Sequence, residues 1–334
     1  MGQRLDKKLY RLDQLEQILL DSHPNGLIKA QIARRIDIHP SEVPTYLADL
    51  GRRMPVYEPM PGRYAIDRDA CKFRLELTQH EAMVVHLAAR LLTTCTDKYN
   101  PHAATLLRKL ARALTGFAPL ISQHVSRSAE VLDDASRRRD PIFMQILETL
   151  TGAWSLRKKV WLTHEMEDGK IYEYEFSPYF IEPYAAGRAI HVIGVRKSPD
   201  RLETAGKLRT FKIERLRTIK LLDATYTIPP DFDPRNKLKD AWGIWYTEKE
   251  PIEVVLRFSR QVAHRIRETQ WHHTEKIEEQ EDGSLIWRAQ IAGWFEMLSW
   301  IKGWGSGCIV LAPDDLRLAV AEDMAKAARN YGGE

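Results

Sequence analysis

Residues 172–216 read YEYEFSPYFIEPYAAGRAIHVIGVRKSPDRLETAGKLRTFKIERL, and this stretch decides the fold class. Residues 172–176 alternate with period two, and residues 189–195 form a nearly continuous apolar run after the turn at Ala186-Gly187. Both patterns are typical of β-strands. Another strand is expected at 160–163, before a hairpin turn at Asp168-Gly169, and one or two more between 208 and 222. We therefore expect about five short strands that close into a small barrel of the SH3/Sm kind.

Basic residues concentrate in the same part of the chain. Residues 155–221 hold 14 Lys and Arg against 9 Asp and Glu, a net charge of +5, whereas the whole chain carries +4. On a fully extended strand, Arg209, Phe211, Ile213 and Arg215 share one face. An arginine beside buried apolar residues is costly without an anionic partner, and a phosphate is a suitable one. Internal pairing with Glu173, Glu175 or Glu182 is the alternative.

These side chains define a candidate effector site, because arginine binds phosphate and aromatic rings stack on bases. Hydroxyl, aromatic and imidazole groups on the neighbouring strands complete it. The predicted effector-binding residues are Ser177, Tyr179, Tyr184, His191, Arg209 and Arg215.

The first 75 residues have the pattern of a small helical domain. Apolar residues recur at spacings of three and four in segments 5–20, 28–36 and 43–50, which predicts three helices. A hairpin is expected over residues 56–66. This order is that of a winged helix-turn-helix domain, whose third helix enters the major groove. If Ser41 is the N-cap of that helix, Pro44 lies in its first turn, where the missing N–H is tolerated.

Binding to a phosphate backbone requires a basic face, and residues 1–75 carry a net charge of +3. Glu42 and Asp49 on the third helix oppose such binding, and a three-helix cap that does not touch DNA is the alternative interpretation. The candidate DNA contacts are Lys29, Arg34, Arg35, Ser41, Thr45, Tyr46, Arg52, Arg53 and Arg63.

Residues 76–150 and 228–334 differ from the strand-rich segment between them. The former are almost wholly helical in pattern, and we expect a linker that mediates dimerisation. The latter follow a proline-rich connection at 228–234 and have the order β-α-β-β-α-β, which predicts a ferredoxin-like α+β unit. We interpret His272-His273 as surface residues, because no Cys, His or Asp lies at zinc-ligand spacing from them. No metal site or cofactor is expected.

Several runs resemble a known family. Residues 176–184, 187–194 and 208–216 are similar to a WYL domain, and residues 271–273, 282–285, 300–305 and 310–317 resemble the C-terminal extension of WYL regulators. The Trp-Tyr-Leu positions are held here by Ile190, His191 and Val192, which still suit a buried strand. The resemblance implies a bacterial transcription regulator, dimeric, with an Sm-like barrel that senses a nucleotide or single-stranded nucleic acid.

The sequence thus predicts an α+β multidomain protein. Its parts are a winged helix-turn-helix domain (1–75), a helical linker for dimerisation (76–150), an SH3/Sm-like WYL barrel that senses a ligand (151–227) and a ferredoxin-like WYL C-terminal extension (228–334). The predicted function is a homodimeric, DNA-binding transcription regulator that binds a double-stranded operator and a nucleotide or single-stranded oligonucleotide effector. The alternative is a nucleic-acid-binding accessory protein without an operator, which modulates a nuclease or a phage-defence system.

Other classes are disfavoured by what the sequence lacks. We find no phosphate-binding P-loop, zinc-protease or serine-hydrolase motif, so an enzyme is not expected. No apolar run is long enough to span a membrane, and the N-terminus does not have the pattern of a signal peptide. The three cysteines, Cys71, Cys95 and Cys308, are far apart, which favours a reducing cytoplasm.

Overall fold

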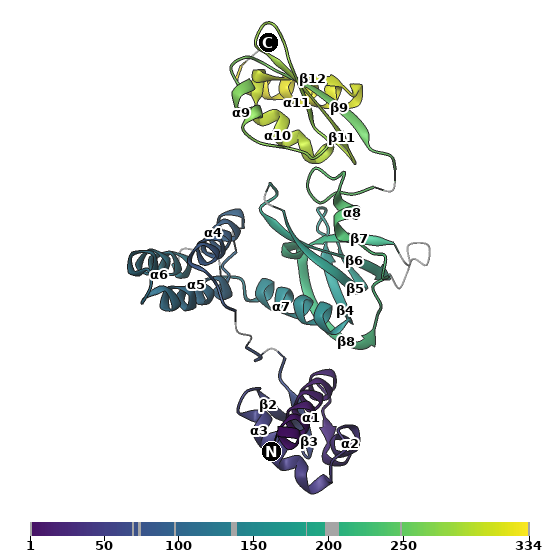
Figure 1. Ribbon diagram of the computed structural model, residues 1–334. Helices are drawn as coiled ribbons and strands as arrows, with labels where there is room; N and C mark the ends of the chain where they lie inside the picture. Colours follow the sequence, from purple (N-terminus) through teal and green to yellow (C-terminus); the bar gives the residue numbers. More distant parts are fainter. Residues whose placement is uncertain are drawn as a thin grey trace. The chain divides into compact units, whose positions relative to one another are not determined.

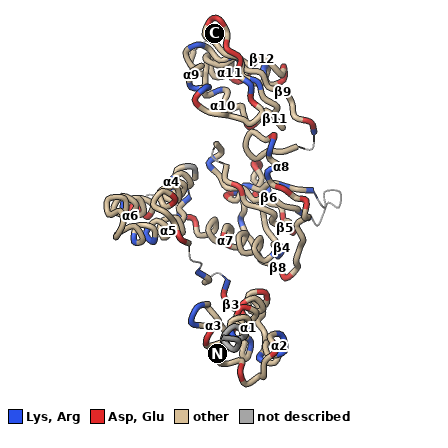
Figure 2. The backbone as a smooth tube through the Cα atoms, in the orientation of Figure 1, with Lys and Arg blue, Asp and Glu red and all other residues tan. Residues whose placement is uncertain are grey.

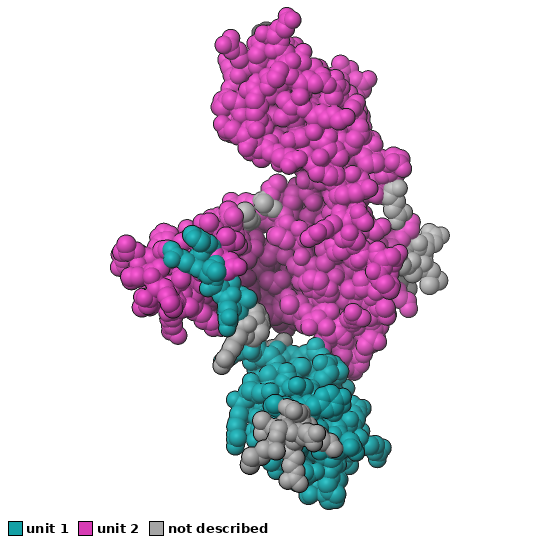
Figure 3. Space-filling view, in the orientation of Figure 1, with its two compact units in different colours: residues 1–80 teal, residues 81–334 magenta. Residues whose placement is uncertain are grey.

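The computed structural model describes residues 2–68, 70–72, 75–96, 98–134, 139–184, 186–197, 207–247 and 249–332. Two compact units make up the chain, residues Met1–His80 and Glu81–Glu334 (Figure 3). Among the described helices, none combines the length and the apolar character needed to cross a bilayer.

Unit 1 contains the three helices and the hairpin that the sequence predicts (Figure 1). Its elements are α1 (Gly2–Asp21), β1 (Leu27–Ile28), α2 (Lys29–Arg35), a 3-10 helix (Pro40–Glu42), α3 (Val43–Gly51), β2 (Val56–Met60) and β3 (Arg63–Ile66). The strands form a sheet in the order β1-β3-β2. Leu15, Ile32 and Leu50 are fully buried between the helices, so one apolar core holds this unit together.

The start of α3 differs from the expectation in detail. A 3-10 helix precedes it, and His39 is the N-cap of this 3-10 helix: its imidazole accepts from the backbone N–H of Ser41. Ser41 itself lies within the 3-10 helix, and the N-cap of α3 is Glu42, so the expected cap at Ser41 is wrong. Because α3 begins at Val43, Pro44 lies in its first turn, where a backbone N–H has no helical partner. The proline therefore fits the helix without a lost hydrogen bond.

Helix α4 (Gln79–Cys95) starts at the last two residues of unit 1 and continues into unit 2. It shares a core that includes Leu107 and Val125 with α5 (Pro101–Leu114) and α6 (Pro119–Asp133). The next helix, α7 (Pro141–Leu156), packs elsewhere. Its apolar face, with Ile146 and Leu150, belongs to the core of the following sheet. The predicted boundary between residues 150 and 151 therefore falls inside a helix that completes the strand-rich domain.

The strand-rich segment forms one antiparallel sheet in the order β7-β6-β5-β4-β8. Its strands are β4 (Lys158–Glu165), β5 (Ile171–Tyr184), β6 (Ala189–Lys197), β7 (Leu208–Lys212) and β8 (Leu216–Thr225). The five predicted strands are present, but the closed barrel is a correction: within the described residues, β7 and β8 remain the two ends of the order. A 3-10 helix (Ile213–Arg215) joins these two ends, so the strand does not continue as an alternating ladder from 208 to 222.

The last part of the chain has the predicted β-α-β-β-α-β order. After α8 (Pro234–Leu238) come β9 (Ile252–Phe258), α9 (Ala263–Arg267), β10 (Lys276–Glu279), β11 (Leu285–Ile291), α10 (Leu298–Gly303), β12 (Cys308–Ala312) and α11 (Asp314–Asn330). The strands pair antiparallel in the order β10-β11-β9-β12. Trp287 and Phe258 are fully buried in its core. His272 corrects the expectation of a surface residue, because only 7% of it is exposed.

Candidate functional site

The five-stranded sheet carries a pocket of about 790 Å³. Side chains from β4, β5, β6 and β7, from the 3-10 helix and from the segment after α8 line it. The fold brings these residues together from sequence positions as far apart as His164 on β4 and Trp245 outside the sheet. A pocket of this size falls within the range of small-molecule sites, roughly 300–1,000 Å³.

Four cationic side chains line the pocket, Arg196, Arg209, Lys212 and Arg215, and none of its described lining residues is acidic. Arg209 donates from Nη1 to its neighbouring backbone oxygen on Leu208 at 3.0 Å and makes no ion pair with a described residue. Arg215 contacts the Glu167 carboxylate at 2.9 Å, but this glutamate is 82% exposed. Exposed ion pairs contribute little, about 0–1 kcal/mol, so an incoming anion can compete for Arg215.

An aromatic floor lies beneath these cations. Phe211 is buried, and its ring centroid lies 4.9 Å from that of His164, 5.3 Å from Tyr174 and 5.2 Å from Phe176. The Arg196 guanidinium carbon lies 5.0 Å from the Tyr174 ring centroid, a cation–π distance. The pocket thus pairs flat apolar surface with positive charge, which suits a base and a phosphate together.

Two buried histidines add neutral polar groups. Burial and, to a smaller extent, the nearby cations Lys212 and Arg215 together lower the pKa of His191 to about 4. The pKa of His164 is also lowered, first by burial and then by Arg215 and Arg196. Both imidazoles are therefore neutral at pH 7. Their Nδ1 atoms are buried and have no hydrogen-bond partner among the described residues.

Tyr184 is held at the edge of the pocket by two glycines. A Cβ atom on Gly187 or on Gly243 would overlap its ring, so only glycine allows this close approach. The Glu296 carboxylate accepts from the backbone N–H groups of Gly243, Ile244 and Trp245 at 3.0–3.2 Å. This carboxylate fixes the segment that brings Ile244 and Trp245 to the pocket.

The structure brings together four of the six predicted effector residues: Tyr184, His191, Arg209 and Arg215 all line the pocket. The three carboxylates of the alternative, Glu173, Glu175 and Glu182, form no ion pair with Arg209 or Arg215 among the described residues. Glu175 pairs with Lys159, and the acidic partner of Arg215 is Glu167 instead. Arg209 and Arg215 reach the same pocket even though the alternation is interrupted, because the 3-10 helix turns Arg215 back toward it.

Ser177 and Tyr179 are placed away from this pocket. The register between β5 and β6 shifts between Pro178 and Phe180, so Tyr179 is the extra residue of a β-bulge. Its ring stacks on Tyr226 at 5.9 Å and meets Phe232 at 5.0 Å. Ser177 is buried beside Gly194. We do not include either residue in the proposed site.

Sequence reasoning missed several lining residues. Arg196 follows the apolar run at 189–195, and Lys212 follows Phe211. Neither basic residue has a spacing in the sequence that marks it as part of a site. His164 and Tyr174 follow the period-two pattern of ordinary strands, and that pattern alone could have placed them on the buried face. Trp245 gave no signal, because its segment lies outside the sheet and is held by a glutamate more than 50 residues away.

Unit 1 places the predicted DNA contacts in different environments. Arg34 and Arg35 are exposed in the last turn of α2, which Figure 2 shows as a basic end, and they make no ion pair with a described residue. Ser41 and Thr45 are also exposed. Lys29 lies 5.8 Å from the Tyr64 ring centroid.

Other predicted contacts already have partners in the protein. Arg52 pairs with Asp49 at 3.2 Å, Arg53 with Asp13 at 3.3 Å, and Arg63 donates to the Gly26 carbonyl. Tyr46 corrects the expectation of an outward residue. It is 8% exposed and packs in the core, because positions 43, 46, 47 and 50 form the buried face of α3.

Comparisons with known proteins place the C-terminal part of the chain. Residues 250–328 match the WCX domain family, which agrees with the predicted C-terminal extension. Proteasome accessory factor B/C (PafBC) of Arthrobacter aurescens is similar at 19% identity and a TM-score of 0.28, over 97% of this chain and 47% of that one. A CRISPR Cas-related protein is similar at 10% identity and a TM-score of 0.40, over 63% and 54%. The chain thus spans about half the length of these two structures, and no curated protein matches.

Proposed function

We propose that this protein is a DNA-binding transcription regulator of the WYL class whose sheet pocket binds an anionic effector, a nucleotide or the end of a single-stranded oligonucleotide. The WCX match at residues 250–328 supports the class. The observation that supports an anionic effector is the composition of the pocket. Its lining combines aromatic rings with four cationic side chains, Arg196, Arg209, Lys212 and Arg215, and none of its described lining residues is acidic.

The chemistry of the pocket assigns a role to each kind of group. Arg209 and Arg215 would hold a phosphate through charge-assisted hydrogen bonds, which are about twice as strong as neutral ones. Tyr184 and Trp245 offer faces for a base, and His191 and His164 offer neutral donors or acceptors to its edge. The effector would shift the affinity of unit 1 for DNA, which is coupling between two sites.

Unit 1 would act as the winged helix-turn-helix domain, with α3 in the major groove. Support comes from its element order and from the exposed, unpaired basic residues at the end of α2. Arg34 and Arg35 are its best candidates for phosphate contacts, and Thr45 is the best candidate on α3.

A homodimer would form through α4. Val84, Leu87 and Leu91 lie at helical spacing on one face and are 65%, 53% and 63% exposed, whereas Ala82, His86 and Ala89 on the opposite face are buried. A second copy of this chain would cover the apolar stripe with its own, as in an isologous two-fold interface.

The test is a double variant, Arg209→Ala with Arg215→Ala, in the full chain. The operator is first selected from genomic fragments bound by the purified protein. The proposal predicts that the double variant binds this duplex as the unaltered protein does, but no longer responds to the effector. Loss of operator binding with unchanged effector affinity would reject the assignment of the two sites.

One observation favours the alternative, an accessory protein that binds single strands without an operator. On α3, Tyr46 is buried and Asp49 is acidic, and both arginines that follow the helix are paired within the chain. A salt titration separates the two functions. A regulator should bind its operator about 10³-fold or more tightly than random duplex, whereas an accessory protein should prefer single strands of any sequence.

A further inference from the structure

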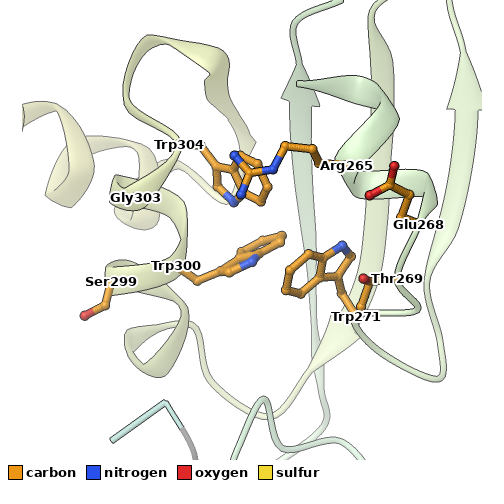
Figure 4. A pocket seen from close by; sticks show the side chains of 8 residues that line it. All are labelled: Arg265, Glu268, Thr269, Trp271, Ser299, Trp300, Gly303 and Trp304. Carbon is orange, nitrogen blue, oxygen red and sulfur yellow. The ribbon is translucent and has the colours of Figure 1, made fainter. Parts of the chain in front are cut away.

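The C-terminal part of unit 2 has a second cavity, of about 430 Å³, that shares no described lining residue with the sheet pocket. Figure 4 shows the rings of Trp271, Trp300 and Trp304 around it, with Arg265 at the Trp304 end and Glu268 beside Trp271. Its volume is within the range of small-molecule sites. Neither the WCX match nor the proposed function assigns a ligand to it.

The three tryptophans form a preorganised aromatic wall. The Trp300 ring centroid lies 5.0 Å from that of Trp271 and 6.0 Å from that of Trp304. On its other side Trp300 packs against Trp242 at 4.7 Å and Phe258 at 5.7 Å, in the domain core. One side of the cluster therefore anchors it, and the other offers apolar surface to a ligand. A Cβ atom on Gly303 would meet nothing within 4 Å, so the wall is open there.

Two opposite charges at the rim are not satisfied by the protein. Arg265 and Glu268 are three residues apart, yet neither forms an ion pair with the other or with any other residue that the structure describes. The Arg265 guanidinium carbon lies 4.7 Å from the Trp304 ring centroid, which holds it at the cavity. By contrast, Arg267 on the same helix makes two hydrogen bonds of 2.5 Å to the Glu279 carboxylate.

The three tryptophans also carry hydrogen-bond donors that lack acceptors in the described part of the protein. The indole Nε1 atoms of Trp271, Trp300 and Trp304 are buried and have no acceptor among the described residues. Buried donors without a partner are rare and costly.

We propose that this cavity binds a free amino acid with an aromatic side chain. The ligand carboxylate would pair with Arg265, its ammonium with Glu268, and its ring would rest on the exposed tryptophan faces. Glu268 would repel a purely anionic aromatic ligand, and Arg265 would repel a purely cationic one. Only a zwitterion satisfies both rim charges, and the lining is then neutral as a whole.

The experiment is calorimetric titration of the full chain with L-phenylalanine, 3-phenylpropionate, which lacks the ammonium, and 2-phenylethylamine, which lacks the carboxylate. We expect saturable 1:1 binding of L-phenylalanine, and a loss of about tenfold or more for each analogue, since each loses a charge-assisted contact. Glycine should bind more weakly than L-phenylalanine, because it has no ring for the tryptophans.

Two variants and two controls locate the binding. Arg265→Gln should weaken L-phenylalanine about tenfold or more but should not weaken 2-phenylethylamine, which has no carboxylate. Glu268→Gln should likewise weaken L-phenylalanine but should not weaken 3-phenylpropionate, which has no ammonium. Arg329→Gln, at an exposed position of α11, and Arg209→Ala, in the sheet pocket, should leave L-phenylalanine binding unchanged. No saturable binding at millimolar L-phenylalanine, or equal affinity in the unaltered protein and the Arg265→Gln variant, would overturn the proposal.

Discussion

Arg209→Ala isolates the contribution of one cation to effector binding. The guanidinium makes one hydrogen bond to a backbone oxygen and no ion pair among the described residues, so its removal should not disturb the fold. A hydrogen bond to a charged group contributes about 1.5–3 kcal/mol, which corresponds to a loss of roughly 10- to 150-fold in affinity. If all four pocket cations contact phosphates of a single strand, the slope of log K against log salt should change from about −2.8 to about −2.1.

The assay is fluorescence anisotropy of a labelled single-stranded oligonucleotide, measured at several salt concentrations. Lys220→Ala is the matched control, because this lysine is exposed on β8 of the same sheet and does not line the pocket. The control should retain both the affinity and the slope. If Arg209→Ala and Lys220→Ala lose affinity equally, the binding is diffuse attraction to the sheet and the pocket has no special role.

Three further predictions concern the packing of the sheet, the burial of His191 and the proposed dimer. Gly194→Ala should lower the free energy of unfolding of unit 2 by about 1–3 kcal/mol, because the new Cβ would overlap the backbone oxygen of Ser177. The loss should appear as a lower urea midpoint. Gly116→Ala is the control, since a Cβ there would have no atom within 4 Å, and it should keep the midpoint unchanged. The pKa of His191 is about 4 when folded, below its usual 6.5, so between pH 6.5 and 4 the unfolded chain binds the extra proton and stability falls as pH falls. His191→Gln should reduce that fall, and an unchanged pH profile of the urea midpoint would contradict the burial argument. Leu87→Asp should convert a dimer to a monomer in light scattering, whereas Thr151→Asp, exposed on α7, should not.

Local patterns in the sequence were enough to find the strands, the helices and two of the arginines of the pocket, Arg209 and Arg215. Period-two alternation located β5, and the apolar run at 189–195 located β6. The same reasoning put Arg209 and Arg215 in one site, although by a continuous strand that the 3-10 helix interrupts. Both residues still line the pocket. They are neighbours as predicted, but they do not share one extended strand.

What the sequence did not give depends on packing between distant segments. The bulge at Tyr179 reverses the side to which that residue points, and period-two alternation does not anticipate it. Tyr46 was predicted to contact DNA, but it lies three residues after Val43 and four before Leu50, on the face of α3 that packs against the other helices. Trp245 reaches the pocket because Glu296 binds the backbone beside it, a contact across more than 50 residues. Within the described part of the chain, the edge strands β7 and β8 do not pair with each other, so the sheet does not close into a barrel. The number of strands alone does not determine whether a sheet closes.

The most direct test of the account is a crystal structure of the full chain with a short single-stranded oligonucleotide. We expect a phosphate within hydrogen-bond distance of the guanidinium groups of Arg209 and Arg215, with a base against Tyr184 or Trp245. A phosphate bound only on unit 1 or on the outer surface, while the sheet pocket holds none, would contradict the central claim.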